Sequence, residues 1–354
     1  MFEAYSFWEK LAHEDRPIFL YGTGNGGDKI ITALKKFGIS LTGVFASDGF
    51  VRDRYFHDYH VRSYSDIREE FGDNIIVLLA FGTTLPEVTE FIELLDHRHE
   101  LIIPEVPLYG GDLFDMNYFC AIRERITDVL SYFDDEKSKN IFCDAINFRL
   151  TGKYKYLSNT ESMENTLKEL FANNTIHTLL DGGAFRGDST EIFAKVFTPD
   201  KIIAVEADPK TFFKLEAYAI QEERTNVECI NAALWNSDGI LQYVSSGSRG
   251  SGESGRNKRA KISSVVSRSI DSIIGDISID FINLDIEGAD SEALHGACET
   301  LRIHEPNLAV SLYHRTEDIF VLTERIRKAL PAHKLFLRRV PCIPMWDLTL
   351  YAVK

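Results

Sequence analysis

A glycine-rich turn between a buried strand and a helix is the feature of this sequence that most restricts its fold. The predicted strand 178–181 ends at Asp181, and the turn that follows contains Gly182, Gly183 and Gly187. Glycine allows a chain to turn tightly and allows a ligand to approach the backbone amides closely. In an open sheet of parallel strands, such a turn lies at the carboxyl edge, where ligands bind. The pattern therefore predicts an α/β sheet with a ligand site at this edge.

A glutamate at the end of the next predicted strand adds to this pattern. Residues 201–206 read as a strand, and Glu206 stands 25 positions after Asp181. A carboxylate there can accept two hydrogen bonds from ribose hydroxyls. The glycine spacing differs from the G-x-G-x-x-G of dinucleotide sites. A tight turn beside a solvated glutamate is the alternative, but the two motifs together favour a cofactor site.

The predicted cofactor contacts come from this turn and from the ends of three further strands. Asp181 and the loop groups can address a charged amino-acid tail, and small residues near Asn231 can line an adenine pocket. The full set is Asp181, Gly182, Gly183, Ala184, Phe185, Gly187, Glu206, Ala207, Asn231, Ala232 and Asp285.

A second group of polar residues follows another buried strand, predicted over residues 281–286. Alternation along the strand places Asp285 and Glu287 on one face, and Asp290 can cap the next helix. Two carboxylates at such an edge are costly to bury without a purpose. His314 follows the strand predicted over 307–313 and reaches the same edge. We expect His314 or Asp285 to act as a general base, with Glu287 orienting the substrate; a purely structural histidine is the alternative.

The chain from residue 175 alternates strands and helices, which indicates parallel pairing. The strand candidates are 178–181, 201–206, 227–232, 281–286, 307–313, 334–340 and 348–353. Only a loop separates the last two, so the final strand is expected to be antiparallel. The fold class is therefore α/β with a seven-stranded sheet.

These motifs, taken in order, resemble the FkbM family of methyltransferases. The matching pieces are Asp181–Gly187, Val205–Pro209, Asn231–Leu234, Leu284–Asp290, Tyr313–Asp318, Leu335–Arg339 and Leu350–Val353, and the likeness covers Phe133–Lys354. The resemblance implies a class I, Rossmann-like methyltransferase fold.

The same resemblance implies an activity. Family members use S-adenosylmethionine and usually methylate oxygen, on acceptors that include sugar hydroxyls, polyketides and other specialised metabolites. By position, Asp181, Gly183 and Glu206 would bind the cofactor. Asp285, Glu287 and His314 would face the reaction centre. We expect O-methylation of a sugar or glycan hydroxyl, nucleotide- or lipid-linked. A scaffold that retains the fold without turnover is the non-enzymatic alternative.

A different glycine motif occurs near the N-terminus. Gly22, Gly24 and Gly27 satisfy G-x-G-x-x-G after the strand 17–21, and Asp48 stands 21 positions beyond Gly27. The region resembles small Rossmann-like domains found beside sugar-modifying enzymes. Recognition of a sugar nucleotide or substrate is the first interpretation, a structural platform the second and NAD-dependent oxidoreductase chemistry the third.

Three regions organise the chain: a Rossmann-like domain over 1–112, a helical connector over 113–172 and the methyltransferase domain over 173–354. The chain carries 39 basic and 54 acidic residues, a net charge of −15, which argues against nucleic acid as a partner. No apolar run is long enough to span a membrane. Five cysteines without a C-x-x-C pair suit a reduced, cytoplasmic protein.

One polar segment interrupts the methyltransferase pattern. Residues 245–261 are rich in glycine, serine and basic side chains. A mobile lid over an anionic acceptor is one interpretation, and a solvated loop is the other. We expect no metal, since nothing fixes the geometry of Asp285, Glu287 and Asp290 as ligands. The sequence leaves open whether the protein forms a homo-oligomer.

Overall fold

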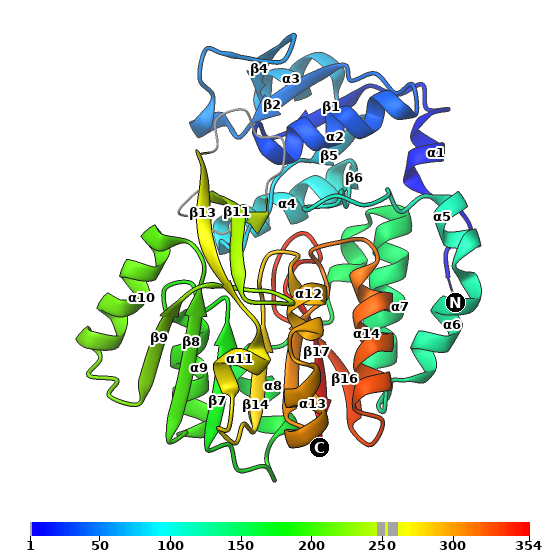
Figure 1. Ribbon diagram of the computed structural model, residues 1–354. Helices are drawn as coiled ribbons and strands as arrows, with labels where there is room; N and C mark the ends of the chain where they lie inside the picture. Colours follow the sequence, from blue (N-terminus) through cyan, green and yellow to red (C-terminus); the bar gives the residue numbers. More distant parts are fainter. Residues whose placement is uncertain (1, 246–251, 254–260) are drawn as a thin grey trace. The chain divides into compact units, whose positions relative to one another are not determined.

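A computed structural model describes residues 2–245, 252–253 and 261–354 (Figure 1). Contacts divide the chain into two compact units. Unit 1 comprises Met1–Thr127, Lys139–Thr160 and Arg339–Asp347, and unit 2 comprises Asp128–Ser138, Glu161–Arg338 and Leu348–Lys354. The predicted connector, residues 113–172, is helical in the structure, and its helices are distributed over both units.

Unit 1 contains a six-stranded sheet in the order β3-β4-β2-β1-β5-β6. Its strands are β1 (Ile18–Tyr21), β2 (Gly43–Ala46), β3 (Tyr55–Phe56), β4 (Tyr59–Ser63), β5 (Ile76–Leu79) and β6 (Glu100–Ile102). All neighbours pair in parallel except β3 with β4. Strand β1 lies between β2 and β5, so the strand order reverses beside the turn that follows β1. Ligands bind at such a point in open α/β sheets.

The helices of the first half surround that sheet or follow it in sequence. They are α1 (Phe7–Leu11), α2 (Asn25–Lys36), η1 (Asp48–Phe50), α3 (Tyr64–Phe71), α4 (Pro86–Arg98), α5 (Met116–Ala121), α6 (Arg123–Ser131), α7 (Glu136–Thr151) and η2 (Tyr154–Leu157). Apolar side chains of α1 and α2, including Trp8, Ile30 and Leu34, pack with Leu20 and Leu78 of the central strands. Burial of these groups stabilises the unit because apolar surface leaves water.

Unit 2 is built on a seven-stranded sheet in the order β16-β17-β15-β14-β7-β8-β9. Its strands are β7 (Thr178–Gly182), β8 (Lys201–Glu206), β9 (Val227–Asn231), β14 (Phe281–Leu284), β15 (Asn307–Ser311), β16 (Lys334–Arg339) and β17 (Leu348–Val353). Strand β17 pairs antiparallel with β15, whereas β8, β7, β14 and β15 run parallel. The predicted α/β fold class and the seven-stranded sheet are confirmed.

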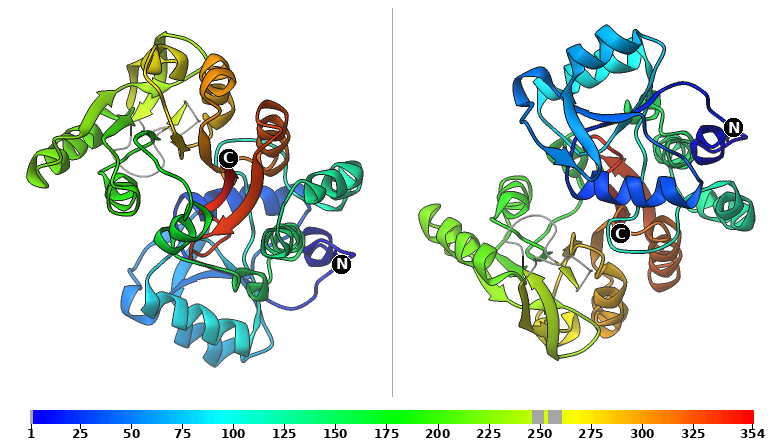
Figure 2. Two further views of the ribbon diagram at one scale, coloured as in Figure 1. Left: turned by 90° about the horizontal axis from the view of Figure 1, so that it is seen from below. Right: turned by 90° about the horizontal axis from the view of Figure 1, so that it is seen from above.

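Both faces of this sheet are covered. The helices are α8 (Met163–Leu170), α9 (Asp188–Phe197), α10 (Pro209–Gln221), α11 (Ile270–Ile274), α12 (Asp290–His295), α13 (Cys298–His304) and α14 (Asp318–Ala329). Leu179 and Phe281 pack on one face with Phe193 of α9. Leu180 and Ile282, which alternation directs to the other face, are equally buried. Burial on both sides explains why these strands read as continuous apolar runs. Helix α10 lies beside the edge strand β9 (Figure 2).

A smaller four-stranded sheet, in the order β10-β13-β11-β12, was not predicted from the sequence. Its strands are β10 (Ala233–Leu234), β11 (Gly239–Ser245), β12 (Gly252–Glu253) and β13 (Lys261–Arg268). Strands β11 and β13 pair antiparallel from Gly239↔Ser267 to Ser245↔Lys261. Most of the predicted basic lid, residues 246–251 and 254–260, lies outside the described residues.

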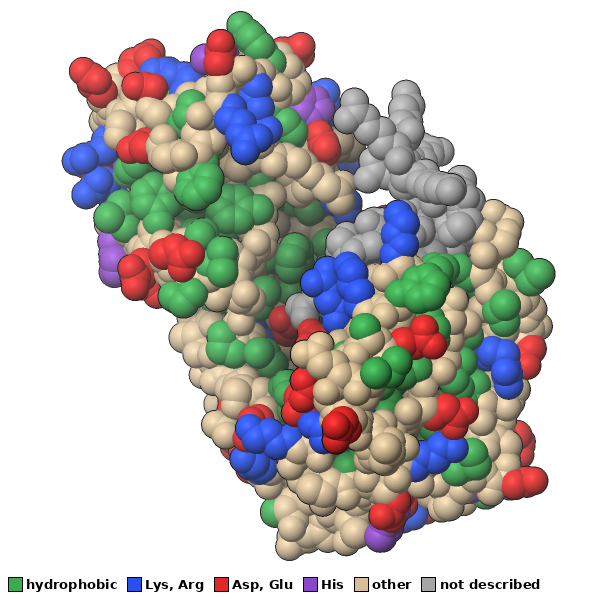
Figure 3. Space-filling model, turned by 90° about the vertical axis from the view of Figure 1, so that its left-hand side faces the viewer, with side chains coloured by type: hydrophobic (Ala, Val, Ile, Leu, Met, Phe, Trp, Pro, Cys, Tyr) green, Lys and Arg blue, Asp and Glu red, His purple; other side chains and the backbone are tan. Residues whose placement is uncertain are grey.

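The surface of the described part carries no extended patch of one charge on the face drawn in Figure 3, where acidic, basic and apolar side chains are interspersed. In the described ranges, no helix is both long and apolar enough to cross a membrane. All five cysteines are free thiols.

Candidate active site

The glycine-rich turn after β7 is held tightly against the ends of two neighbouring strands. The amides of Gly183 and Ala184 donate to the carbonyl of Val205 in β8, at 2.9 and 3.1 Å. Gly183 has φ +83°, and a Cβ atom there would lie 2.0 Å from the carbonyl oxygen of Asp285. Only glycine fits at this position, because both the backbone conformation and the contact exclude a side chain.

Asp181 fixes the start of this turn. Its carboxylate is fully buried and accepts hydrogen bonds from Ser189 Oγ at 2.8 Å, Thr190 Oγ1 at 2.7 Å and Asn283 Nδ2 at 2.9 Å. Burial raises the pKa of Asp181, and the three donors oppose that shift. The structure thus gives Asp181 a role in joining β7, α9 and β14. Its predicted contact with a cofactor stays a prediction.

Glu206 joins the turn to the end of β8. Its carboxylate accepts hydrogen bonds from the backbone amides of Phe185, at 3.1 Å, and Asp208, at 2.7 Å. Burial raises the pKa of Glu206 to about 7, because these bonds only partly offset the loss of water around the charge. Asn231 Nδ2 donates to the carbonyls of Glu206, at 2.8 Å, and Ala207, at 3.3 Å. The predicted cofactor residues at the ends of β7, β8 and β9 therefore form one connected group.

A second group lies at the carboxyl ends of β14 and β15. Asp285 Oδ1 accepts a hydrogen bond from the Tyr313 hydroxyl at 3.0 Å and lies 3.2 Å from His314 Nε2. Burial raises the pKa of Asp285, but the hydrogen bond and charge of His314 outweigh it, and the pKa is lowered. The side chain of Asp285 is 43% exposed, whereas that of His314 is fully buried. Asp285 is thus the member of this pair that can meet a substrate.

His314 lies between carboxylates on both sides of its ring. Nδ1 lies 2.9 Å from Asp290 Oδ2, and Nε2 lies 4.0 Å from Glu287 Oε2 in addition to its contact with Asp285. Burial lowers the pKa of His314, but the charges of Asp290 and Asp285 outweigh it and raise the pKa well above its usual range. The raised pKa favours the protonated imidazole, in which Nδ1–H donates to Asp290 and Nε2–H forms an ion pair with Asp285.

Glu287 adopts a left-handed backbone conformation, with φ +57°, immediately before Gly288. For a residue with a side chain this conformation costs about 1 to 2 kcal/mol. Such conformations gather at functional sites, where the surrounding structure holds them in place. The Glu287 side chain is 26% exposed, so it lies at the accessible side of the His314 ring.

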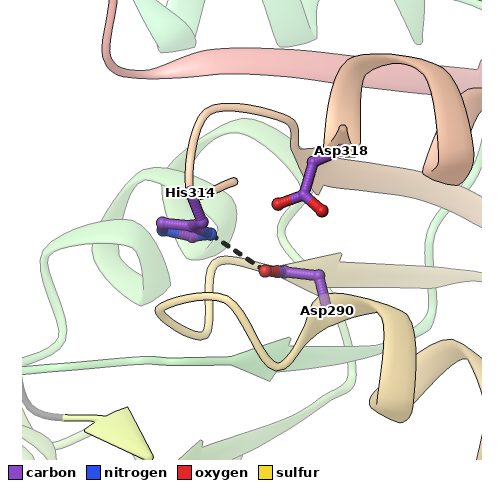
Figure 4. Close-up of side chains that lie close together, drawn as sticks. All are labelled: Asp290, His314 and Asp318. Atoms are coloured by element: carbon purple, nitrogen blue, oxygen red, sulfur yellow. Dashed lines mark hydrogen bonds and ion pairs between the residues drawn. The ribbon is translucent and has the colours of Figure 1, made fainter. Parts of the chain in front are cut away.

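Two acidic residues of this region were missed as site residues by the sequence predictions. Asp290, which the sequence suggested as a helix cap and as one member of an acidic group with Asp285 and Glu287, is 1% exposed and contacts His314. Asp318, the first residue of α14, is 4% exposed and faces the same ring (Figure 4). Burial and the charge of Asp290 raise the pKa of Asp318 to about 7. Neither residue could be found from spacing, because α12 and α14 meet here only in the folded chain.

The predicted N-terminal glycines lie in unit 1, at the turn after β1. Gly24 has φ +141°, caps α2 without a side-chain hydrogen bond, and would place a Cβ atom in open space. Asp48, the candidate ribose ligand of an NAD-type site, accepts hydrogen bonds from the backbone amide of Ser65 at 3.0 Å and from its hydroxyl at 2.5 Å. Through these bonds the Asp48 carboxylate contacts the first turn of α3.

The residues at the strand ends of unit 2 lie in a segment that matches a known protein family. Residues 181–336 match the family model described as the methyltransferase FkbM domain. The chain contains an FkbM methyltransferase domain. The match begins at Asp181 and includes every predicted site residue of unit 2. It confirms the resemblance that the ordered motifs of the sequence predicted.

The solved structures most similar in fold include a methyltransferase FkbM from Methylobacillus flagellatus KT. It is 19% identical, and the match covers 99% of this chain and 94% of that chain, with a TM-score of 0.71. Fibrillarin from Aeropyrum pernix, in complex with S-adenosyl-L-methionine, is 11% identical over 51% of this chain and 67% of its own, with a TM-score of 0.33. A search of curated protein sequences finds no match.

Proposed function

We propose that the FkbM methyltransferase domain transfers a methyl group from S-adenosylmethionine to a hydroxyl oxygen of a sugar or glycan, nucleotide- or lipid-linked. One observation carries the proposal: the glycine-rich turn, Glu206, Asp285 and His314 all lie at the carboxyl ends of adjacent parallel strands in one sheet. Ligands bind at this edge in open α/β sheets. The family match independently supports a methyltransferase.

The residues present fit a nucleoside cofactor. Glu206 is a buried carboxylate at the end of β8, and vicinal ribose hydroxyls are suitable donors to it. Phe185, with φ +51°, turns the backbone next to Glu206. Asn231 and Ala232 follow at the end of β9 and can border a base. Bound here, S-adenosylmethionine would supply an electrophilic methyl group.

For the acceptor side, Asp285 is the residue best placed to receive the hydroxyl proton. It is exposed enough to meet a substrate, and Tyr313 and His314 hold its carboxylate in place. His314 already carries a proton and is buried, so it orients Asp285. Glu287 can bind a second hydroxyl of the acceptor. Alignment of the attacking oxygen supplies much of the barrier reduction in a displacement of this kind.

Calorimetry with S-adenosylhomocysteine tests the cofactor site. We expect binding to unit 2 that the Glu206→Ala variant loses and that Glu216→Ala, an exposed change on α10, retains. At a hundredfold excess over the dissociation constant, the ligand should stabilise the protein by about 2.7 kcal/mol. Absence of binding, or equal binding by Glu206→Ala, would refute the assignment.

Methyl transfer to a panel of sugars, glycans and nucleotide sugars tests the acceptor. Asp285→Asn keeps the shape of the side chain but removes the base, so we expect kcat to fall by about 10²- to 10⁴-fold. Methylation of nitrogen or carbon acceptors alone would contradict the choice of oxygen.

A second proposal concerns unit 1, where the G-x-G-x-x-G turn lies at the point of strand-order reversal. We propose that Gly22, Gly24 and Gly27 border a site for a sugar nucleotide. Asp48 lies in η1, beyond the end of β2, whereas an NAD-type site has its ribose carboxylate at the strand end, and this favours a sugar nucleotide. Separate titrations with a UDP-sugar and NADH distinguish the two, and binding of NADH alone would restore the oxidoreductase alternative.

A further inference from the structure

Three buried ionisable side chains converge on the inner side of the His314 ring. Asp290 comes from α12, His314 follows β15 and Asp318 begins α14, and their exposed fractions are 1%, 0% and 4%. Each residue has one potential metal-ligand atom within 4.8 Å of such an atom of the other two. Figure 4 shows both carboxylates turned toward the ring.

Asp318 brings a second buried carboxylate close to Asp290 and His314. Its Oδ2 accepts a hydrogen bond from the backbone amide of Arg315 at 2.9 Å. Within the described ranges, no hydrogen bond or ion pair joins its side chain to Asp290 or His314, although all three are buried. Two ionised carboxylates this close together repel each other, and burial removes the water that would screen them. A cation bound between them would offset both costs.

The spacing suits an atom placed between the three groups. Oxygen and imidazole nitrogen ligands lie about 2.0 to 2.2 Å from a divalent ion such as Zn²⁺, so two ligands of one ion are at most about 4.4 Å apart. The observed separations require only a small inward movement to reach this value. A donor set of two carboxylates and one imidazole suits Mn²⁺ or Zn²⁺ better than soft ions.

The other nitrogen of His314 faces a carboxylate, as the second nitrogen of a metal-binding histidine usually does. Nε2 lies 3.2 Å from Asp285 Oδ1. Histidines that bind a metal through one nitrogen generally donate from the other to a carboxylate or carbonyl, which fixes the tautomer and the ring. Charge points the same way, because Asp285, Glu287, Asp290 and Asp318 surround a single imidazole.

We propose that Asp290, His314 and Asp318 bind a divalent cation of the Mn²⁺ or Zn²⁺ class through His314 Nδ1 and one oxygen of each aspartate. The ion takes the place of the Nδ1 proton, which is released to solvent on binding. The bound ion joins α12, the segment after β15 and α14, and holds the Nε2 side of His314 toward Asp285. This site revises the expectation that the protein holds no metal. It stands independently of methyl transfer, since its test requires neither cofactor nor acceptor.

The test is a titration of the full chain, treated with a chelator and dialysed, with Mn²⁺ and separately with Zn²⁺. Calorimetry should show about one site per chain, and the electron paramagnetic resonance signal of free Mn²⁺ should fall with the same stoichiometry. Asp318→Asn keeps the acceptor for the Arg315 amide but loses the charge. We expect it to weaken binding at least about 10-fold, as changes at or around metal ligands do.

Asp276→Asn, at an exposed position before β14, is the matched control and should bind as the unaltered protein does. Thermal unfolding in chelator checks that Asp318→Asn is folded. Failure of both ions to bind, or equal binding by Asp318→Asn, would overturn the proposal. Loss of binding in Asp285→Asn and Glu287→Gln, with Asp318→Asn unaffected, would also overturn it, because the ion would then lie among the outer carboxylates.

Discussion

Asp290 Oδ2 and His314 Nδ1 lie 2.9 Å apart in a contact from which water is almost excluded, since the two side chains are 1% and 0% exposed. The same chain contains an exposed counterpart. His177 Nδ1 lies 2.7 Å from Asp200 Oδ2, with side chains 65% and 79% exposed. The two pairs share residue types and nearly share a distance, but they differ in burial, which decides how much each contributes to stability.

Asp290→Ala is therefore expected to lower the free energy of unfolding by about 3 kcal/mol, because it leaves a buried imidazole without its carboxylate. Asp200→Ala, the control, should change it by less than about 1 kcal/mol. Urea denaturation of both variants, followed by fluorescence and circular dichroism in chelator, measures the difference. Equal destabilisation by the two changes would show that burial does not determine how much an Asp–His pair contributes to stability.

The local parts of this site could be read from the sequence. Asp181 to Gly187 is a continuous strand, turn and helix, and the position of Glu206 follows from the next strand end. Such features depend on neighbouring residues, so backbone conformation and alternation are enough to predict them. The same holds for the seven-stranded sheet, whose buried strands are short apolar runs bounded by turns.

Other features depend on contacts between distant segments and left no local signal. The segment Arg339–Asp347, between β16 and β17, belongs to unit 1, where Ile343 pairs with Thr83. A Cβ atom on Gly82 would lie 2.3 Å from the ring of Trp346, a contact no spacing rule reveals. Asp318 likewise reads as an ordinary helix start. Strands β11 and β13 were missed because they flank a polar, glycine-rich segment that reads as a loop.

Gly183→Ala is expected to disrupt the glycine-rich turn. The new Cβ atom would lie 2.0 Å from the carbonyl of Asp285 at φ +83°, so the turn or the end of β14 must move. Gly275→Ala is the control: its φ is +52°, but no atom lies within 4 Å of the added Cβ. Gly275→Ala should cost only the backbone strain of about 1 to 2 kcal/mol.

Thermal unfolding and calorimetry with S-adenosylhomocysteine compare the two variants. We expect Gly183→Ala to be the less stable protein and to lose binding, while Gly275→Ala retains it. Normal binding by Gly183→Ala would mean that the turn can move without consequence for the ligand.

Asp181→Ala is expected to leave two buried donors, the Thr190 hydroxyl and the Asn283 amide, and the half-buried Ser189 hydroxyl without their acceptor. Each unsatisfied buried group costs about 1 to 3 kcal/mol, so we expect a loss of at least about 2 kcal/mol. Asp181→Asn keeps an oxygen acceptor and should lose less. Urea denaturation measures both, and a destabilisation below about 1 kcal/mol in Asp181→Ala would contradict the structural role.

The pKa of Glu206 predicts how its ionisation affects stability. Burial raises the pKa to about 7 from 4.5, so the folded protein binds this proton more tightly than the unfolded chain does. The contribution of Glu206 to stability is therefore fully present below pH 4.5 and is lost as the pH rises through 7. Thermal unfolding across this range should show a smaller decline in Glu206→Gln, which stays neutral. An unchanged decline would assign the effect to other groups.

Ligand binding should depend on pH in the opposite direction, because ribose hydroxyls donate best to the ionised carboxylate. With a pKa of about 7, the ionised fraction of Glu206 rises from about a tenth at pH 6 to about nine tenths at pH 8. The affinity for S-adenosylhomocysteine should rise about tenfold over this range. Calorimetry at pH 7 in buffers of different ionisation enthalpy should also detect proton release. Glu206→Gln should bind more weakly and without the rise, and the same rise in that variant would show that another group titrates.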